Sequence, residues 1–303
     1  MKVGIVGIGA VGSSAAYAMI MSGAASELVL IDPDEGLARA QAEDLEDATP
    51  FASPARVRAD SYPGLAGARL VALCCGARRR PGESRLELVA RNAEIFREVV
   101  AGVMAHAPDA VVLVVSNPVD LLTGLVSRLS GLAPGRVLGT GTLLDTARFR
   151  ARLASFAGVS PRSVHGYVLG EHGDSEVLVW STATVGGVPL AQFAEQLGRP
   201  LTAEAIAMVD EGVRHGGARI IQGKGATFYG IGGAITQIAR AVRDDERVLL
   251  TVSAPSPELD ACLSLPRIVG AQGVERTLIP ALTADELAAL ERSAGILRKA
   301  AIP

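Results

Sequence analysis

The stretch that decides the fold is Lys2-Val3-Gly4-Ile5-Val6-Gly7-Ile8-Gly9-Ala10-Val11-Gly12, a short apolar run leading into the glycine spacing G-x-G-x-x-G. A segment with helical periodicity follows over residues 13–22. A strand before the glycines and a helix after them are the context of a dinucleotide-binding βαβ unit. Such glycines permit a tight turn and close approach to a pyrophosphate, which the helix N-terminus favours. We therefore expect a cofactor site at Gly7, Gly9, Val11 and Gly12.

A second predicted strand, residues 28–31, ends in Asp32, which lies 20 residues past Gly12. A carboxylate at this point accepts a hydrogen bond from a ribose 2′-hydroxyl and repels a 2′-phosphate, so the sequence favours NAD over NADP. The alternative is a plain βαβ unit without a cofactor. Strand, glycines, helix, strand and terminal acid in one unit favour the cofactor site.

The first half of the chain alternates apolar runs with segments of helical period, which predicts a doubly wound parallel sheet. Further strands are expected at 70–75, 110–115 and 137–138, and helices at 36–48, 86–106 and 121–129. The second half is expected to be α+β. Its strands are expected at 164–169, 176–184, 247–253 and 263–269, and its helices at 142–156, 188–197, 203–221, 228–241 and 284–298. The prediction is an α/β protein with a Rossmann domain over 1–142 and a substrate-binding, catalytic domain over 143–303.

Composition excludes several classes of function. The 303 residues are 49% hydrophobic with a formal net charge of −3, which argues against a nucleic-acid or anionic-membrane surface. No apolar run reaches the roughly 18 residues that span a bilayer, and the N-terminus shows no secretory signal. The three cysteines have no CxxC spacing, which favours buried thiols in the cytoplasm. The four histidines have no metal-ligand spacing, so no metal site is expected.

Three segments carry side chains suited to chemistry. His172 lies between glycines in the run 170–175, and an imidazole suits proton transfer near neutral pH. Asp145 and Arg148 are three residues apart and share a helix face. Asn117 follows a predicted strand at the edge where parallel sheets bind ligands. The alternatives are a surface histidine in a turn, an ordinary helix ion pair, and a turn asparagine before proline.

Residues 78–85, Arg-Arg-Arg-Pro-Gly-Glu-Ser-Arg, hold four arginines around a Pro-Gly break. Such a run forms poor core and poor regular structure. It is either a solvated charge run or part of a mobile loop, residues 76–86, whose arginines close over an anionic ligand.

With these residues placed, the chain resembles the lactate/malate dehydrogenase family along its whole length. The motifs that carry the resemblance are Gly7 to Gly12, Pro81 to Arg85, Ser116-Asn117-Pro118, Leu144 to Arg148, Gly170 to Ser175 and Gly225-Ala226-Thr227. The resemblance implies reversible hydride transfer between NADH and a 2-oxo acid. It implies His172 as proton donor and acceptor, with Asp145 orienting it. Arg148 would bind the substrate carboxylate, and Arg85 would polarise the reacting carbonyl.

The resemblance also implies roles for residues near the cofactor and the substrate. Asn117 and Thr227 would contact the substrate. The residues expected beside the cofactor, besides those of the glycine motif and Asp32, are Gly76, Ala77, Ser116, Asn117 and Ile231. A homotetramer or dimer is expected on the same ground. Two classes of function remain as alternatives, a nucleotide-binding protein without turnover and a metal-assisted NAD enzyme.

Most of the chain looks like the bacterial lactate dehydrogenase branch. Arg150 and His165 match the positions at which that branch binds fructose 1,6-bisphosphate; the alternative is a pair of surface or interface residues. One residue departs from the branch. Lactate dehydrogenases carry glutamine six positions before the loop arginine, and this chain has Arg79. Arg79 can pair with the second carboxylate of oxaloacetate, whereas pyruvate would leave it buried and unpaired at a cost of about 3–5 kcal/mol. The sequence therefore favours malate/oxaloacetate, with lactate/pyruvate as the alternative.

Overall fold

Six parallel strands form the part of the sheet that the glycine motif predicts. Their spatial order is β3-β2-β1-β4-β5-β6, the doubly wound order of dinucleotide-binding folds. The computed structural model describes residues 1–77 and 85–302, the side chains of residues 85 and 86 excepted. The six strands are β1 (Lys2–Val6), β2 (Glu27–Ile31), β3 (Arg56–Ala59), β4 (Leu70–Leu73), β5 (Val111–Val114) and β6 (Val137–Gly139).

Helices cover both faces of this sheet because its strands are apolar on both sides. The helices are α1 (Ala10–Met21), α2 (Glu35–Ala48), α3 (Arg85–His106) and α4 (Val119–Ser130). Val3 and Ile5 pack with α1 and α2 in one core, while Val6 packs with α3 and α4 in the other. Successive residues of β1 thus point to opposite helical layers.

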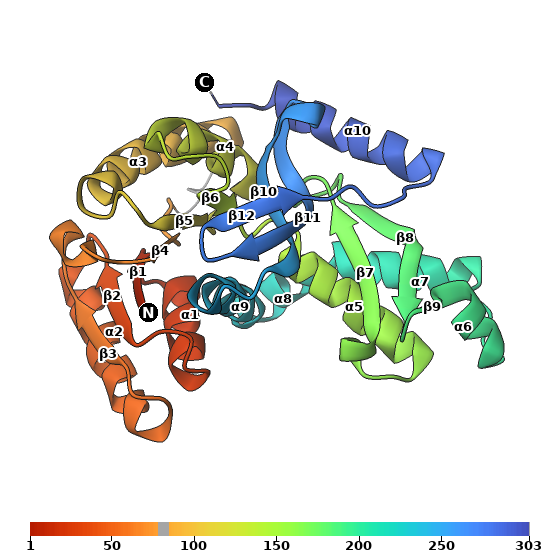
Figure 1. Ribbon diagram of the computed structural model, residues 1–303, viewed down its shortest axis with the longest axis horizontal. Coiled ribbons are helices and arrows are strands. Elements are labelled where there is room, and N and C mark those ends of the chain that lie inside the picture. Colours follow the sequence, from red (N-terminus) through yellow and green to blue (C-terminus); the bar gives the residue numbers. More distant parts are fainter. Residues whose placement is uncertain (78–84, 303) are drawn as a thin grey trace.

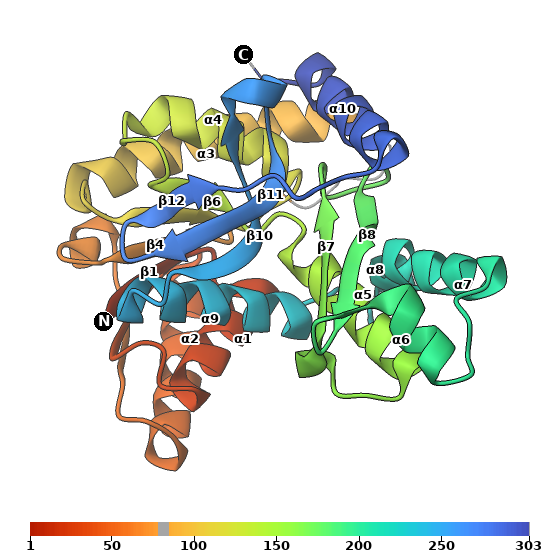
Figure 2. The same cartoon turned by 45° about the vertical axis from the view of Figure 1, so that its right-hand side comes forward.

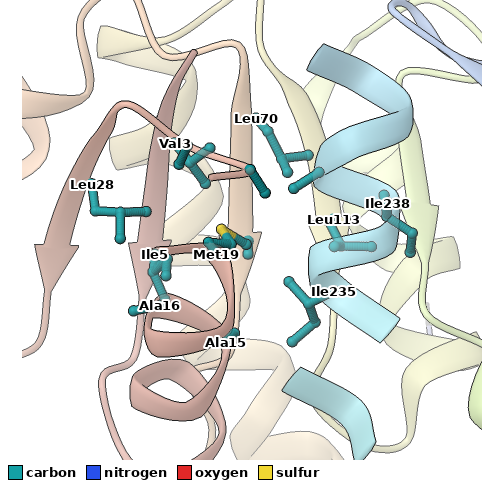
Figure 3. Close-up of a cluster of buried hydrophobic side chains, with 14 of the residues drawn as sticks. Val3, Ile5, Ala15, Ala16, Met19, Leu28, Leu70, Leu113, Ile235 and Ile238 are labelled. Carbon is teal, nitrogen blue, oxygen red and sulfur yellow. The ribbon is translucent and has the colours of Figure 1, made fainter. Parts of the chain in front are cut away.

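Three antiparallel strands from the second half extend the same sheet. They are β10 (Val248–Ser256), β11 (Ala261–Gly270) and β12 (Gly273–Thr277), and β10 joins β6 where Ser253 pairs with Gly139. Helix α9 (Tyr229–Asp244) packs beside α1, so Ile235 and Ile238 share the core of β1 and α1 (Figure 3). Strands expected near 247–253 and 263–269 are present as β10 and β11, and they lie in the same sheet as the first six strands.

A second group of elements, three strands and four helices, forms the lobe that lies opposite β1–β3 in Figures 1 and 2. A three-stranded antiparallel sheet of β7 (Val164–Leu169), β8 (Val177–Val185) and β9 (Val188–Pro189) is joined there by α5 (Leu143–Ala157), α6 (Leu190–Gln196), α7 (Ala203–Arg214) and α8 (Gly216–Lys224). The single helix expected over 203–221 is therefore two helices that meet at His215. The last helix, α10 (Ala284–Lys299), packs on β8 and β11. Short 3-10 turns occur at Thr49–Phe51, Tyr62–Leu65, Pro161–Ser163 and Pro257–Leu259.

A buried arginine ties β10, β11 and β12 together. Arg267 is 0% exposed, and its guanidinium donates to the carbonyl oxygens of Val252, Leu263 and Ala254 and to Thr277 Oγ1. Burial lowers the pKa of Arg267 to about 10. The backbone carbonyls replace a carboxylate as the partners of this cation.

Across residues 1–77 and 85–302, no helix is long and apolar enough to cross a membrane.

Candidate active site

The glycine loop between β1 and α1 leaves room for a pyrophosphate. Gly7 has φ +92°, and a Cβ there would lie 2.4 Å from the backbone nitrogen of Cys75. A Cβ on Gly12 would lie 2.1 Å from the carbonyl oxygen of Gly7. A Cβ on Gly9 would meet nothing within 4 Å, and Gly9 precedes a helix that has no side-chain cap. The loop thus presents bare backbone at a helix N-terminus, which suits a dinucleotide.

Asp32 is held beside this loop at the end of β2. One carboxylate oxygen accepts the Ile8 N–H at 2.9 Å, and the other accepts the Asp34 N–H at 3.1 Å. These bonds fix the carboxylate where the ribose of a dinucleotide on the loop would lie. The described residues therefore fit NAD as the cofactor.

Asn92 joins the ends of β4 and β5, where Gly76, Ala77, Ser116 and Asn117 lie. Its Oδ1 accepts the Ala77 N–H at 2.8 Å, and its Nδ2 donates to the Asn117 carbonyl at 3.3 Å. Asn92 is 2% exposed. Asn92 was not among the residues predicted from the sequence. The one available signal was that Asn92 and Asn117 are the only two asparagines in the chain.

A continuous set of polar contacts joins His172, Asp145 and Arg148. Asp145 Oδ2 lies 2.6 Å from His172 Nδ1, and Asp145 Oδ1 accepts from Arg148 Nη1 at 2.7 Å. Asp145 and Arg148 lie on α5, and His172 lies in the loop between β7 and β8. The Asp145 side chain is 4% exposed and that of His172 is 30% exposed, so a buried carboxylate orients an accessible imidazole. The predicted triad-like arrangement is present.

The electrostatics of this group favour the imidazolium form. Burial lowers the pKa of His172, but the hydrogen bond and the charge of Asp145 outweigh it and raise that pKa to about 9. Burial raises the pKa of Asp145, yet His172 and Arg148 outweigh it and hold that pKa below its ordinary value. Near neutral pH these contacts therefore favour the protonated form of His172.

The backbone of His172 is held by a second buried carboxylate. The His172 N–H donates to Asp120 Oδ2 at 2.8 Å, and Ser253 Oγ donates to Asp120 Oδ1 at 2.6 Å. Asp120 is 2% exposed and lies in the first turn of α4. Asp120 was not predicted as a site residue, although it closes the run Ser116 to Asp120 that contains Asn117.

Glu176 is a third carboxyl group close to this cluster. It is 5% exposed, and its Oε1 has no hydrogen-bond partner among the described residues. Burial and the charge of Asp145 raise the pKa of Glu176 to about 8, against the opposing charges of Arg214, His172 and Arg148. The sequence offered no signal for it beyond its place after the histidine loop.

Two hollows meet at His172. One, of about 300 Å³, brings together six residues that the sequence predicted, and it also has lining residues that were not predicted. The predicted residues are Val11, Asn117, Arg148, His172, Thr227 and Ile231. Those missed are Val115, Thr140, Gly141, Leu144, Gly217, Ala218 and Ile221. The other hollow, of about 500 Å³, lies against α10 and the start of α4. The smaller hollow is therefore the candidate site for substrate and nicotinamide.

Two predicted site residues cannot be placed in this geometry. Arg79 lies outside the described residues, as does most of the expected loop 76–86. Arg85 begins α3, but its side chain is outside the described part.

The predicted effector residues lie on neighbouring elements away from the cavity. Arg150 on α5 donates through Nε to the Gly166 carbonyl at 3.0 Å, and its guanidinium lies 5.6 Å from the centre of the Tyr167 ring. His165 on β7 is exposed. The Arg150 cation is thus already engaged by backbone and ring.

Within residues 1–77 and 85–302, no group of three or more His, Cys, Asp or Glu side chains is arranged to hold a metal ion. The three cysteines are free and partly buried.

Comparison with family models matches two regions of the chain. Residues 1–139 match the model of the lactate/malate dehydrogenase NAD binding domain. Residues 142–302 match the model of the lactate/malate dehydrogenase alpha/beta C-terminal domain.

Similar proteins extend over nearly the whole chain. The L-lactate dehydrogenase of Thermus aquaticus is 55% identical over 305 residues, covering 99% of this chain and 98% of that protein. The L-lactate dehydrogenase of Deinococcus radiodurans is 54% identical over 299 residues, covering 98% and 97%. The crystal structure of the minor L-lactate dehydrogenase from Enterococcus mundtii in its ligands-bound form superposes with a TM-score of 0.95 at 43% identity, covering 98% of this chain and 96% of that one.

Proposed function

The chain belongs to the lactate/malate dehydrogenase family and is an NAD-dependent 2-hydroxy-acid dehydrogenase, and we propose that it interconverts pyruvate and L-lactate. The observation that supports this choice of substrate is that relatives 46–55% identical to the chain are named L-lactate dehydrogenase. The comparisons do not support malate as the first choice. The polar contacts around His172 support proton exchange with either substrate.

Each polar residue of the smaller hollow has a part in this proposal. Arg148, 19% exposed in its side chain, binds the substrate carboxylate. His172 exchanges a proton with the substrate oxygen through Nε2, because Nδ1 is engaged with Asp145. Asn117 and Thr227 contact the substrate from the cavity wall. Arg85 polarises the carbonyl as its oxygen gains charge.

A second set of residues binds the cofactor. Gly9 leaves open space for the pyrophosphate, Gly7 and Gly12 permit the close packing of the loop, and Asp32 selects a ribose without a phosphate. Val11 and Ile231 line the hollow and pack on the nicotinamide ring. Further contacts come from Gly76, Ala77 and Ser116. When bound, the nicotinamide supplies or takes the hydride.

The raised pKa of His172 determines the pH range over which each direction is catalysed. Reduction of an oxo acid needs protonated His172, so it persists up to the folded pKa of about 9 and is lost above it. Oxidation of the hydroxy acid needs neutral His172 and increases as pH rises through the same value.

A second candidate substrate pair, oxaloacetate and malate, is favoured by one specific observation, the arginine at position 79. An arginine there pairs with a second carboxylate, and leaving it buried and unpaired costs about 3–5 kcal/mol. By this reasoning the preference for oxaloacetate would be a hundredfold or more.

The deciding experiment measures kcat/KM for pyruvate and for oxaloacetate with NADH at neutral pH, in the wild type, in Arg79→Gln and in the neighbouring control Arg80→Gln. A wild type that prefers pyruvate supports the lactate proposal. A hundredfold preference for oxaloacetate that Arg79→Gln reverses and Arg80→Gln leaves in place establishes the malate candidate instead. Absence of turnover with both acids contradicts both.

Three further features belong to the same proposal. The domains are a cofactor domain over 1–142 and a catalytic domain over 143–303. The enzyme is a cytoplasmic homotetramer or dimer, which sedimentation tests. Arg150 and His165 bind fructose 1,6-bisphosphate, and the deciding assay repeated with this effector should show activation that Arg150→Gln abolishes.

A further inference from the structure

Asp120 links three parts of the chain that are far apart in the sequence. It lies in the first turn of α4, and its two carboxylate oxygens accept from the His172 backbone and from Ser253 on β10. These partners are 52 and 133 residues away. The cofactor half, the histidine loop and the antiparallel extension of the sheet therefore meet on one buried side chain.

A buried carboxylate at this position destabilises the fold unless a nearby positive charge interacts with it. Asp120 is 2% exposed and forms no ion pair with a described arginine or lysine. Burying an ion carries a desolvation penalty, and two neutral donors offset only part of it. An asparagine could accept the same His172 N–H without that cost. Two groups can offset the charge of Asp120, the buried Arg267 on β11 and His172. Of these, His172 is the one whose charge changes during the reaction.

We propose that Asp120 is a positioning residue for catalysis, which holds the histidine loop through the His172 N–H and stabilises the imidazolium form of His172 by its charge. Asp145 acts on the ring through Nδ1, whereas Asp120 acts on the same residue from the backbone side. His172 thus has two buried carboxylates, one from each half of the chain. The inference rests on the proposed function only in its kinetic test.

The charged and titratable groups around Asp120 come from two other elements. Glu171 and His172 face it from the loop, and Cys262 and Arg267 lie near it on β11. Burial raises the pKa of Asp120 to about 6, against the opposing hydrogen bonds of Ser253 and His172. Between about pH 6 and pH 9, Asp120 is therefore ionised while His172 is still protonated.

The kinetic test compares Asp120→Asn with Ser253→Ala, which breaks the same hydrogen-bond network but keeps the carboxylate. The readout is the alkaline limb of kcat/KM for oxo-acid reduction, which reports the pKa of His172 in the free enzyme. Asp120→Asn should move this limb down by about one pH unit, a tenfold loss of proton affinity. Ser253→Ala should leave it at the wild-type pH or above. A folded Asp120→Asn enzyme with an unmoved limb shows a merely structural role and overturns the proposal.

A second measurement needs neither turnover nor a variant of Asp120. The chain has four histidines, so ¹⁵N-histidine labelling gives four backbone amide signals, and His172→Asn identifies the one from His172. In ligand-free wild type this signal should show an inflection on the acid side of the His172 titration as Asp120, which accepts the His172 N–H, takes up its proton. A signal with no such inflection, down to the acid limit of the folded protein, overturns the proposal. Failure of the proposed function would appear only in the kinetic test.

Discussion

Glu176→Gln should be more stable than the wild type, and the difference in unfolding free energy should grow as pH rises. The wild-type carboxyl group is 5% exposed and its Oε1 lacks a hydrogen-bond partner among the described residues. Because burial is the main cause of its raised pKa, the folded protein disfavours the charged form. Glutamine has nearly the same shape and does not titrate, so the substitution removes the pH-dependent part of this cost.

The magnitude follows from the pKa values of Glu176 in the unfolded and folded states. The ordinary value is 4.5 and the folded value is about 8. The stability that wild type has below pH 4.5 is lost as pH rises towards the folded value. The loss has an upper limit of about 5 kcal/mol, and by pH 7 about 3 kcal/mol of it has occurred. Since Asp145 and His172 titrate in the same cluster, we expect at least about 2 kcal/mol between pH 5 and pH 8.

The assay is urea unfolding of the ligand-free protein at pH 5 and pH 8, at one protein concentration, for wild type and Glu176→Gln. Glu43→Gln on the exposed face of α2 is the matched control. The unfolding free energy of Glu176→Gln minus that of wild type should be larger at pH 8 than at pH 5. For the control, this difference should be the same at both pH values. An equal difference at both pH values would refute the reasoning.

Three further outcomes follow from the contacts described. Asp145→Asn should bring the pKa of His172 from about 9 to 6.5 or below, so pyruvate reduction at pH 7.5 should fall about tenfold with an earlier alkaline limb in the pH profile. Asp32→Asn removes the repulsion of a 2′-phosphate, and the ratio of kcat/KM for NADH over NADPH should fall at least about tenfold. Arg267→Met removes four hydrogen bonds of a buried side chain and should lower the urea-unfolding free energy by about 3–5 kcal/mol, roughly 1 kcal/mol for each. An unchanged profile, cofactor ratio or midpoint would contradict the respective argument.

The sequence predicted those parts of the fold that have a local signal. Apolar runs, glycine spacing and helical period placed the first strands and helices of the sheet close to their observed bounds. Strand β3, Arg-Val-Arg-Ala, was not predicted because only Val57 is buried and its neighbours are polar. Strands β10 and β11 were predicted, but their joining to the first sheet was not, because it pairs Ser253 with Gly139, which are distant in the sequence.

The same distinction applies to the site. His172, Asp145 and Arg148 belong to recognisable motifs, and the structure brings them together. Asp120 and Glu176 have no local signal for function, since their roles arise from burial and from partners supplied by other elements. A buried carboxylate cannot be distinguished from an exposed one by its letter in the sequence. The missed residues are thus the ones defined by environment rather than by spacing.

The packing of α9 against α1 has a consequence for synthesis on the ribosome. A Cβ on Gly232 would lie 3.1 Å from the Ser14 backbone, so the two helices are in close contact. Ala15 and Met19 on α1 are fully covered in the finished protein, and Ile235 on α9 belongs to the same core. While the first 142 residues emerge, that apolar surface has no cover and β6 is an open edge. We therefore expect the N-terminal half to bind chaperones until residue 256 has left the exit tunnel, although its cofactor motif is the first part of the chain to be made.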